Sequence, residues 1–292
     1  MAPAAPAAAG PSDPMRPVRP EFVPDPSLSR AEMEEIQRDI AGTAVFADDL
    51  PVDPGTVGVG GESSGAAVPE AEEGTQTRLE GTGTADDRPL VAGVDQAFVG
   101  DRAVSAVVVL RDGEVVERVH AVAETAIPYI PGLLSFREGG AVLAAFAALE
   151  REPDLALVDG SGRIHFREAG LATHVGVVLD LPTVGVAKNL LCGTPRESLD
   201  RELPAGTRVP VEADADVETA KAGTVIGHAL QTRQFESGNR HVNPVFVSPG
   251  HRVSAGTAAD LVEQCCDGYK LPEPTRLADS YADEVKADVD GG

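Results

Sequence analysis

Lysine and long hydrophobic runs are both scarce in this sequence. Of the 24 Lys and Arg residues only four are lysine, whereas Asp and Glu total 47. No stretch of about 18 uninterrupted apolar residues occurs, so nothing in the sequence predicts a membrane span. The first 14 residues are rich in Ala and Pro and have no basic start, which is not typical of a secretory signal. We therefore expect no membrane partner and a cytoplasmic location.

Cysteine is also rare. Cys192 and the adjacent pair Cys265 and Cys266 give neither a disulfide framework nor a CxxC spacing. We interpret them as reduced, mostly buried thiols in a reducing compartment.

The charge is strongly one-sided, with a formal net charge of −23. An acidic surface of this kind stays soluble through self-repulsion and is typical of proteins adapted to high salt; an ordinary acidic cytosolic protein is the alternative. The net charge argues against indiscriminate nucleic-acid binding at low salt, although it leaves room for a local basic patch.

The 292 residues are enough for one or two domains, and a hydrophobic content of 42% excludes wholesale disorder. Residues 54–87 contain eight glycines, seven acids, one base and no aromatic residue, which predicts a disordered acidic insertion. The predicted organisation is a flexible tail (1–28), an N-terminal helix and connection (29–53), the insertion (54–87), a main domain (88–282) and a flexible tail (283–292).

Capping and periodicity predict the first elements. Ser29 and Glu32 fit a capping box before a helix over 29–41. Residues 90–95, 103–110 and 114–124 read as strands, and the Asp112-Gly113 pair between the last two predicts a hairpin. We expect these three strands to be antiparallel.

Helices and strands then alternate. Helices are predicted over 135–150, 170–179 and 255–266, and strands over 155–160, 183–187, 224–232 and 244–247. The short, wholly apolar strand at 155–160 is typical of a central parallel strand. This order predicts an α/β fold with a ribonuclease H-like mixed sheet flanked by helices.

Three acids occupy positions where a site is expected. Asp95 and Asp159 end strands, and Glu138 begins a helix. Carboxylates that converge at one edge of an α/β sheet repel one another unless a divalent cation holds them, and Mg²⁺ suits such oxygen ligands. Each acid also has a purely structural interpretation: a strand end for Asp95, a turn for Asp159, and a capping box with Ser135 for Glu138.

Several long motifs resemble the endonuclease V family of deoxyinosine-specific nucleases. They are 128–138 (PYIPGLLSFRE), the run from 158 to 188 that contains VDGSG, GLATH and PTVGVAK, then 248–253 (SPGHRV) and 271–279 (LPEPTRLAD). The resemblance is strong over 89–282 and weak over 29–50, and the motifs are specific because they occur in the family's order.

The resemblance implies a metal site and a phosphate contact. Asp95, Glu138 and Asp159 fall on the family's three metal-binding carboxylates, and Asp279 falls on a fourth position close to the metal. The implied cofactor is Mg²⁺, with Mn²⁺ as a substitute. Lys188 corresponds to the family's catalytic lysine near the scissile phosphate, and its alternative is a solvated loop charge.

The resemblance also implies a lesion-binding set. Tyr129 matches the tyrosine that enters the duplex at the lesion, and its alternative is an aromatic residue packed between prolines. The other implied lesion-binding residues are Pro131, Gly132, Leu134, Gly160, Gly162 and His165, of which His165 is a candidate phosphate contact and the glycines allow close approach to the base. His174 is expected to pack within its helix.

The sequence departs from the family at two positions. Ser161 stands where the family usually has His, which puts a proton-shuttle role there in doubt. Gln96 follows Asp95 where a small or β-branched residue is common.

The resemblance therefore implies a Mg²⁺-dependent, monomeric endonuclease whose partner is inosine-containing DNA. It would cut the second phosphodiester bond 3′ to the lesion and leave 5′-phosphate ends. Two alternatives remain open: a nuclease that acts on inosine-containing RNA, and a nuclease-dead module that only binds the lesion.

Overall fold

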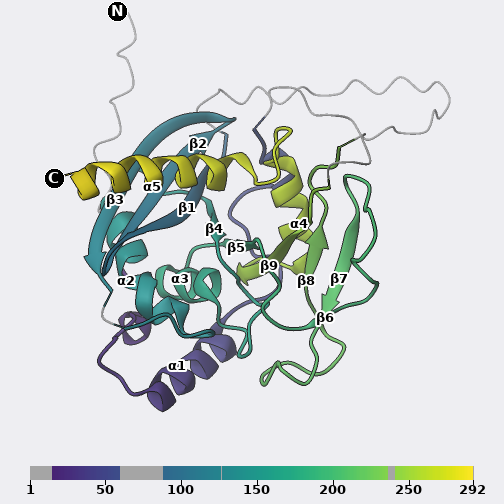
Figure 1. The fold of residues 1–292 in the computed structure, drawn as a ribbon, viewed down its shortest axis with the longest axis horizontal. Helices are drawn as coiled ribbons and strands as arrows, with labels where there is room; N and C mark the ends of the chain where they lie inside the picture. Colours follow the sequence, from purple (N-terminus) through teal and green to yellow (C-terminus); the bar gives the residue numbers. More distant parts are fainter. Residues whose placement is uncertain (1–14, 60–87, 126, 236–240, 292) are drawn as a thin grey trace, which may run out of the picture.

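A nine-stranded mixed sheet forms the centre of the computed structural model, which describes residues 15–59, 88–125, 127–235 and 241–291 (Figure 1). Its strand order is β3-β2-β1-β4-β5-β9-β8-β7-β6. The strands are β1 (Leu90–Val99), β2 (Arg102–Arg111), β3 (Glu114–Glu124), β4 (Leu155–Asp159), β5 (Thr183–Ala187), β6 (Thr194–Pro195), β7 (Arg208–Glu212), β8 (Val225–Leu230) and β9 (Val245–His251).

The pairing matches the predicted mixed sheet. β1, β2 and β3 form an antiparallel meander, and β4 and β5 then add in parallel beside β1. The Asp112-Gly113 hairpin is confirmed, because β2 ends and β3 begins on either side of it. β9, β8, β7 and β6 continue the sheet with antiparallel pairing. The sequence did not predict β6, which has two residues, or β7, which has five residues and carries Pro210 between its buried Val209 and Val211.

The helices are α1 (Arg30–Thr43), α2 (Leu134–Ala147), α3 (Leu171–Leu179), α4 (Ala255–Gln264) and α5 (Glu273–Gly291), with short 3₁₀ helices η1 (Pro20–Phe22) and η2 (Pro54–Thr56). α2 and α3 pack on one face of the sheet, whereas α4 and α5 pack on the other. α1 lies outside α3 (Figure 1). No helix in the described ranges has the length and hydrophobicity needed to cross a membrane.

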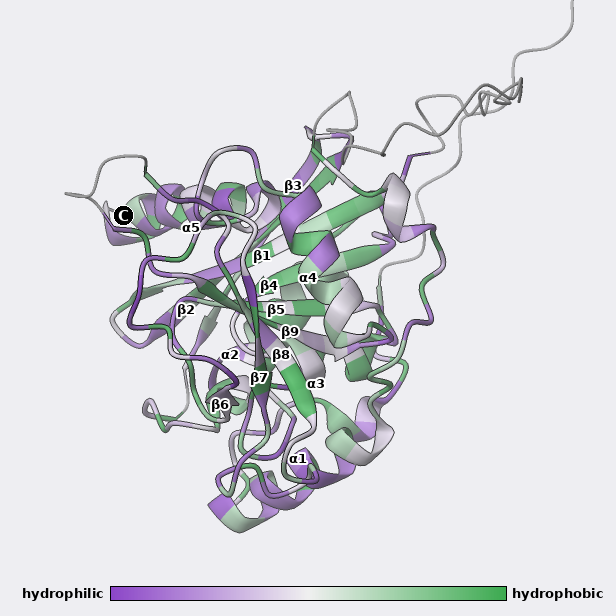
Figure 2. Ribbon diagram, turned by 90° about the vertical axis from the view of Figure 1, so that its right-hand side faces the viewer, coloured by the Kyte–Doolittle hydropathy of each residue, from purple (hydrophilic) through white to green (hydrophobic). Residues whose placement is uncertain are grey.

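Alternation along the strands explains the two cores. On β4, Ala156 and Val158 face α2 and α3, and Leu155 and Leu157 face α4. Because successive strand residues point to opposite faces, each buried strand contributes to both cores and reads as continuously apolar. Figure 2 accordingly shows the central strands in the most hydrophobic colours.

The predicted N-terminal tail is partly wrong. The main-chain N–H groups of Val18 and Arg19 donate to Val178 O at 2.8 and 3.1 Å, which docks this segment on α3. His174 Nε2 donates to Phe22 O at 2.6 Å, and its ring meets Phe136 edge-on, so the helix-packing role expected for His174 is confirmed. Residues 1–14 lie outside the described part of the chain.

The boundary predicted for the acidic insertion also needs correction. Residues 54–59 are placed: η2 begins at Pro54, and Val57 is buried in the core that contains α4. The insertion therefore begins no earlier than residue 60, and residues 60–87 lie outside the described ranges.

The flexible tail predicted for 283–292 is wrong for 283–291, which belong to α5. Ala282 and Val285 are buried against Ala97, Val104 and Ala106 of the sheet. The helical apolar spacing along 278–285 is what holds this acidic segment on the protein.

One capping box is confirmed and the other is wrong. Ser29 Oγ accepts from the Glu32 N–H, and Glu32 Oε2 accepts from the Ser29 N–H. In contrast, α2 begins at Leu134 with Leu133 as its N-cap, and Ser135 Oγ is buried without a partner. Glu138 therefore does not serve a capping box with Ser135.

Candidate active site

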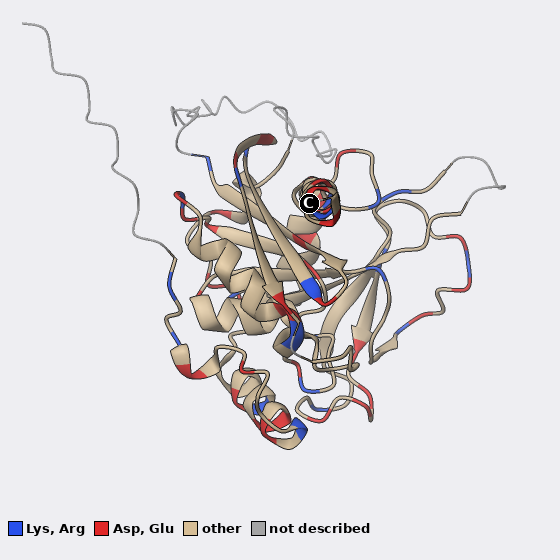
Figure 3. Ribbon diagram, turned by 60° about the vertical axis from the view of Figure 1, so that its left-hand side comes forward, with Lys and Arg blue, Asp and Glu red and all other residues tan. Residues whose placement is uncertain are grey.

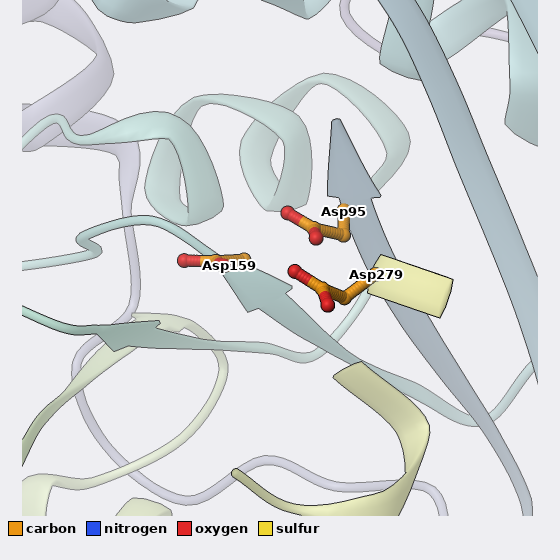
Figure 4. A group of neighbouring side chains, drawn as sticks. All are labelled: Asp95, Asp159 and Asp279. Atoms are coloured by element: carbon orange, nitrogen blue, oxygen red, sulfur yellow. The ribbon is translucent and has the colours of Figure 1, made fainter. Parts of the chain in front are cut away.

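Three carboxylates meet at the carboxyl edge of the parallel strands. In the β1–β4 register Val94 lies opposite Val158, so Asp95 and Asp159 follow side by side, and both point to the face covered by α5. Asp279 of α5 joins them (Figure 4). One oxygen from each side chain lies within 4.8 Å of those from the other two.

A glycine in β1 lets α5 bring Asp279 to this edge. A Cβ on Gly93 would lie 1.9 Å from the main-chain oxygen of Pro274 in the first turn of α5. Only a residue without a side chain permits this approach. Gly93 lies two residues before Asp95 on the same face, so the contact also fixes α5 next to the site.

The pKa of Asp95 is strongly raised in this group. Burial, then the Asp159 charge, and then a hydrogen bond with Asp279 raise the pKa of Asp95 to about 8. Lys188 Nζ lies 2.8 Å from Asp159 Oδ2 and 3.6 Å from Asp279 Oδ1. Burial alone would lower the pKa of Lys188, but Asp159 outweighs it and the pKa is raised, so the ammonium stays charged.

Glu138 approaches from the opposite face of the sheet. It is buried in the second turn of α2, and burial, with a smaller contribution from Asp159, raises its pKa to about 7. It lines the same cavity as the three aspartates but does not belong to their close group. The tightest set in the described residues is thus Asp95, Asp159 and Asp279.

The donor chemistry of this set fits a hard divalent cation. All the candidate ligand atoms are carboxylate oxygens, which suit Mg²⁺ and Mn²⁺ rather than softer metals. Two of the three side chains come from buried strands, Asp95 from within β1 and Asp159 from the end of β4, which fixes their separation. The prediction that Asp95 ends its strand is wrong, because β1 continues to Val99. A cation here would relieve the repulsion that raises the pKa of Asp95.

Two adjoining cavities of about 450 Å³ each flank the carboxylates. They share Tyr129, Leu134, Asp159 and Lys188 in their walls. The first contains the aspartates, Glu138, Gln96, Phe98 and Arg137, with the Arg137 guanidinium 4.9 Å from the centre of the Phe98 ring. The second is lined by glycines, apolar residues and several polar ones, and includes Pro131, Gly132, Gly160, Ser161 and His165.

Comparison with known proteins identifies this arrangement. The profile of the Endonuclease V family matches residues 74–280. The chain belongs to the endonuclease V family. It is 67% identical to Endonuclease V of Haloarcula marismortui over 93% of this chain and 97% of that protein.

Solved structures agree with this assignment. Endonuclease V of Streptomyces avermitilis is 33% identical and superposes with a TM-score of 0.66, covering 89% of this chain and 94% of that one. Ciona intestinalis Endonuclease V, solved with a 24mer DNA containing an inosine followed by a ribo-adenosine, shares the fold at 22% identity and a TM-score of 0.60, over 89% and 98% of the two chains. The ribonuclease H-like fold predicted from the sequence is confirmed.

Most of the residues that the family resemblance implied lie together. Tyr129, Pro131, Gly132, Leu134, Gly160 and His165 all line the second cavity. The Tyr129 side chain is 65% exposed, so the alternative of a packed aromatic is wrong. Ser161, at the position where the endonuclease V family usually has His, also lies in this wall.

Gly162 has a different role from the one expected. Its added Cβ would lie 2.4 Å from Pro249 O, and its N–H donates to Ser248 Oγ at 2.9 Å. Gly162 therefore packs directly on β9, behind the cavity wall. Its missing side chain makes room for the sheet rather than for a base.

The phosphate contact expected of His165 is also not supported. Nε2 lies 3.1 Å from Gly132 O, and Nδ1 accepts from the Arg167 N–H at 3.2 Å. Burial, followed by the Arg167 charge, lowers the pKa of His165 to about 3, so the ring is neutral. Both ring nitrogens are committed to main-chain partners.

The sequence interpretation missed Phe98 and Arg137 in the first cavity. Both had a usable signal. Phe98 lies on the same strand as Asp95, and Arg137 directly precedes Glu138 on α2. Extending the predicted strand from residue 95 to residue 99, where β1 ends, would have placed Phe98 beside the site.

Proposed function

We propose that this protein is a DNA repair endonuclease that recognises deoxyinosine and hydrolyses the second phosphodiester bond 3′ to the lesion. The products have 3′-hydroxyl and 5′-phosphate ends, and no glycosidic bond breaks. Membership of the endonuclease V family supports an endonuclease, and the inosine-containing DNA bound to the Ciona relative supports the lesion.

The convergence of Asp95, Asp159 and Asp279 carries this proposal. These side chains, with Glu138 approaching from α2, would hold Mg²⁺ or Mn²⁺. Such a cation, when bound, would lower the pKa of an attacking water and stabilise charge on the leaving oxygen. The protein positions the carboxylates on two rigid strands and one helix, so that the scissile phosphate docks at a fixed place.

Lys188 serves the same phosphate. Its ammonium projects from the end of β5, remains charged, and is about half exposed. A compact point charge at this edge attracts a phosphate oxygen without requiring a planar geometry. In the resting protein the two aspartates keep the ammonium in place.

The second cavity takes the extruded base. Its wall offers main chain at Gly132 and Gly160 and the apolar side chain of Leu134, and it opens beside Asp159 and Lys188. Tyr129, exposed at the mouth of both cavities, fills the space that the base leaves in the duplex. An inosine mispair is weakly held in the stack, which lowers the cost of extrusion.

The test is a nicking assay on end-labelled duplexes that differ only in inosine or adenine at one position. We expect one cut at the second phosphodiester 3′ to inosine with Mg²⁺ or Mn²⁺, and none with EDTA or with adenine. A matched inosine-containing RNA forms the second arm. Preference for RNA would assign the RNA alternative, and binding without cutting in every metal would assign a lesion-binding module.

A further inference from the structure

One main-chain oxygen in the second cavity wall is held by three side chains. Gly132 O accepts from Gln37 Nε2 at 2.8 Å and from His165 Nε2 at 3.1 Å, and Arg167 Nη2 lies 3.5 Å away. Gly132 belongs to the loop between Tyr129 and Leu134, which line the cavity on either side of it. The donors come from α1 and from the loop between β4 and α3, so the anchor joins distant parts of the chain.

Gln37 connects this oxygen to a buried charge. Its Oε1 accepts from Arg167 Nε at 2.8 Å, so the amide is oriented by a donor on one side and an acceptor on the other. Arg167 Nη1 donates to Glu218 Oε1 at 3.0 Å, and Arg38 Nη2 of α1 donates to Glu218 Oε2 at 2.9 Å. Gln37 is fully buried and Arg167 nearly so.

The His165 contact has a fixed direction. Because Nδ1 accepts from the Arg167 N–H, the proton of the neutral ring is on Nε2, which donates to Gly132 O. Gly132 O therefore accepts hydrogen bonds from N–H groups of Gln37 and His165, with Arg167 nearby. The contact with the Gln37 amide is the shortest of the three.

α1 lies outside residues 74–280, the part that the family profile matches. Gln37 does not line the cavity that contains the aspartates, and the hydrogen bonds of its side chain go to Gly132 O and Arg167. A buried glutamine whose two ends are both paired makes the segments it joins rigid, because loosening them would leave a buried polar group without a partner.

We propose that Gln37 is a positioning residue for lesion recognition: it locks the Gly132 carbonyl, and with it the loop that carries Tyr129, in the conformation that receives the extruded base. This inference rests on the proposed role of the second cavity as the base site. Preorganised walls bind a ligand more tightly because less order has to be created on binding. Loosening Gly132 should weaken recognition of inosine while leaving ordinary contacts with the DNA backbone intact.

Two variants remove the Gly132 contact in different ways. Gln37→Met keeps the volume and deletes both hydrogen bonds. Gln37→Glu keeps an acceptor for Arg167 but replaces the donor to Gly132 O by a second oxygen. Gln231→Met is the matched control, because Gln231 is equally buried and its Nε2 donates to Arg233 O and Val242 O at 2.6 and 2.7 Å, outside both cavities.

The first readout is the ratio of dissociation constants for adenine and inosine duplexes, measured by fluorescence anisotropy in molar KCl with EDTA. We expect both Gln37 variants to lower this ratio about tenfold, the usual scale for one buried hydrogen bond, with unchanged affinity for the adenine duplex. Gln231→Met should lose stability but keep the ratio.

The second readout needs no lesion. Hydrogen exchange of a peptide covering 129–134 should accelerate in both Gln37 variants and not in Gln231→Met. If the wild-type protein bound adenine and inosine duplexes with equal dissociation constants, the proposed base site would be rejected. The exchange experiment would still test whether Gln37 holds the 129–134 loop. The positioning role is overturned if the Gln37 variants keep the wild-type ratio and exchange, or if Gln231→Met lowers the ratio equally.

Discussion

At the scale of single residues, the acidic side chains of the site can lie close together because each has a partner that compensates it. Asp159 is compensated by Lys188, and Asp95 shares a hydrogen bond with Asp279. Burial, the Asp159 charge and the Asp279 hydrogen bond all raise the pKa of Asp95, which records how unfavourable a second charge is in that place. The site is thus stabilised by compensation in the resting protein, and the same oxygens are the ligands that we propose for the cation.

Removing one of these ligands should separate binding from cleavage. Asp159→Ala deletes a carboxylate on a strand end and should abolish nicking, because activation of water needs the held cation. Lesion binding should persist, since most of the second cavity wall is formed by residues other than Asp159. The control is Asp288→Ala, an exposed acid on α5. Normal nicking by Asp159→Ala would reject the metal assignment.

The thiols provide a second residue-scale test. Burial raises the pKa of Cys192, Cys265 and Cys266 to about 12, so all three are protonated at pH 8. Since the thiolate is the reactive form, we expect little reaction with a thiol reagent in the folded protein and three equivalents in denaturant. Rapid labelling of a folded thiol at pH 8 would contradict this.

At the scale of elements, local patterns were enough for the central sheet. Short apolar runs predicted β1 and β4, and two alternating runs around Asp112-Gly113 predicted β2 and β3. Helix α5 was not predicted, and its second half was interpreted as a flexible tail because its many acids look solvated; only the spacing of Ala278, Ala282 and Val285 reveals a buried face. Docking of 15–28 and 54–59 depends on partners far along the chain, which no local pattern contains.

The site was predictable in the same partial way. The acids were found from strand ends and family motifs, but their grouping depends on faces of the sheet. Asp279 reaches the pair because Gly93 admits α5, whereas Glu138 comes from the other face. The Gln37 anchor carries no motif at all, since a lone glutamine in a helix is indistinguishable from a surface residue.

Helix α5 should be a stabilising element to its last turns. Val285→Ser removes buried apolar surface next to Ala97 and Val104 and should lower the free energy of unfolding by about 2 kcal/mol. Lys286→Ser, its exposed neighbour, should change it by less than about 0.5 kcal/mol. Denaturant unfolding followed by circular dichroism in molar KCl measures both. Equal free energies of unfolding for the two variants would instead support the original interpretation of 283–292 as a flexible tail.

Residues 60–87 should be dispensable. The residues on either side of this segment, Val59 and Arg88, both lie at the turn between β2 and β3. Val59 packs on Gly113, and Arg88 Nη1 lies 4.0 Å from Asp112 Oδ1. A linker of about four glycine and serine residues can therefore replace the segment at small cost in closure entropy. We expect unchanged cooperative unfolding and nicking. Loss of cooperative unfolding would show that the segment belongs to the core.

At the scale of the whole molecule, acidic side chains greatly outnumber basic ones, and the basic side chains near the site are already paired with acids. Charged residues are spread over the loops and outer helices (Figure 3). Near the site, Arg163 pairs with Glu168 at 2.6 Å, Arg167 with Glu218 at 3.0 Å and Lys188 with Asp159 at 2.8 Å. The basic patch that could meet a phosphate is therefore already neutralised in part. The relative that is 67% identical comes from Haloarcula marismortui, a halophilic archaeon. This supports the interpretation of the acidic surface as an adaptation to salt.

Salt should therefore help this protein approach DNA. Protein–DNA affinity normally falls steeply as salt rises, because phosphate contacts release counterions. Here a protein of charge −23 must approach a polyanion, and that repulsion is strongest at low salt, where the screening length is about 10 Å at 0.1 M against about 3 Å at 1 M. We expect affinity for an inosine duplex to change weakly or to improve up to molar KCl, and folding itself to require salt that screens the acids.

The measurement is the affinity for one inosine duplex at several KCl concentrations, with circular dichroism at each to confirm that the protein is folded. An uncharged osmolyte at low salt is the control, since it can restore folding without screening charge. If screening is the cause, osmolyte restores the fold but not the affinity. A steep, monotonic loss of affinity in protein that is folded throughout would mean that counterion release dominates, and that the acidic surface lies too far from the bound DNA to repel it.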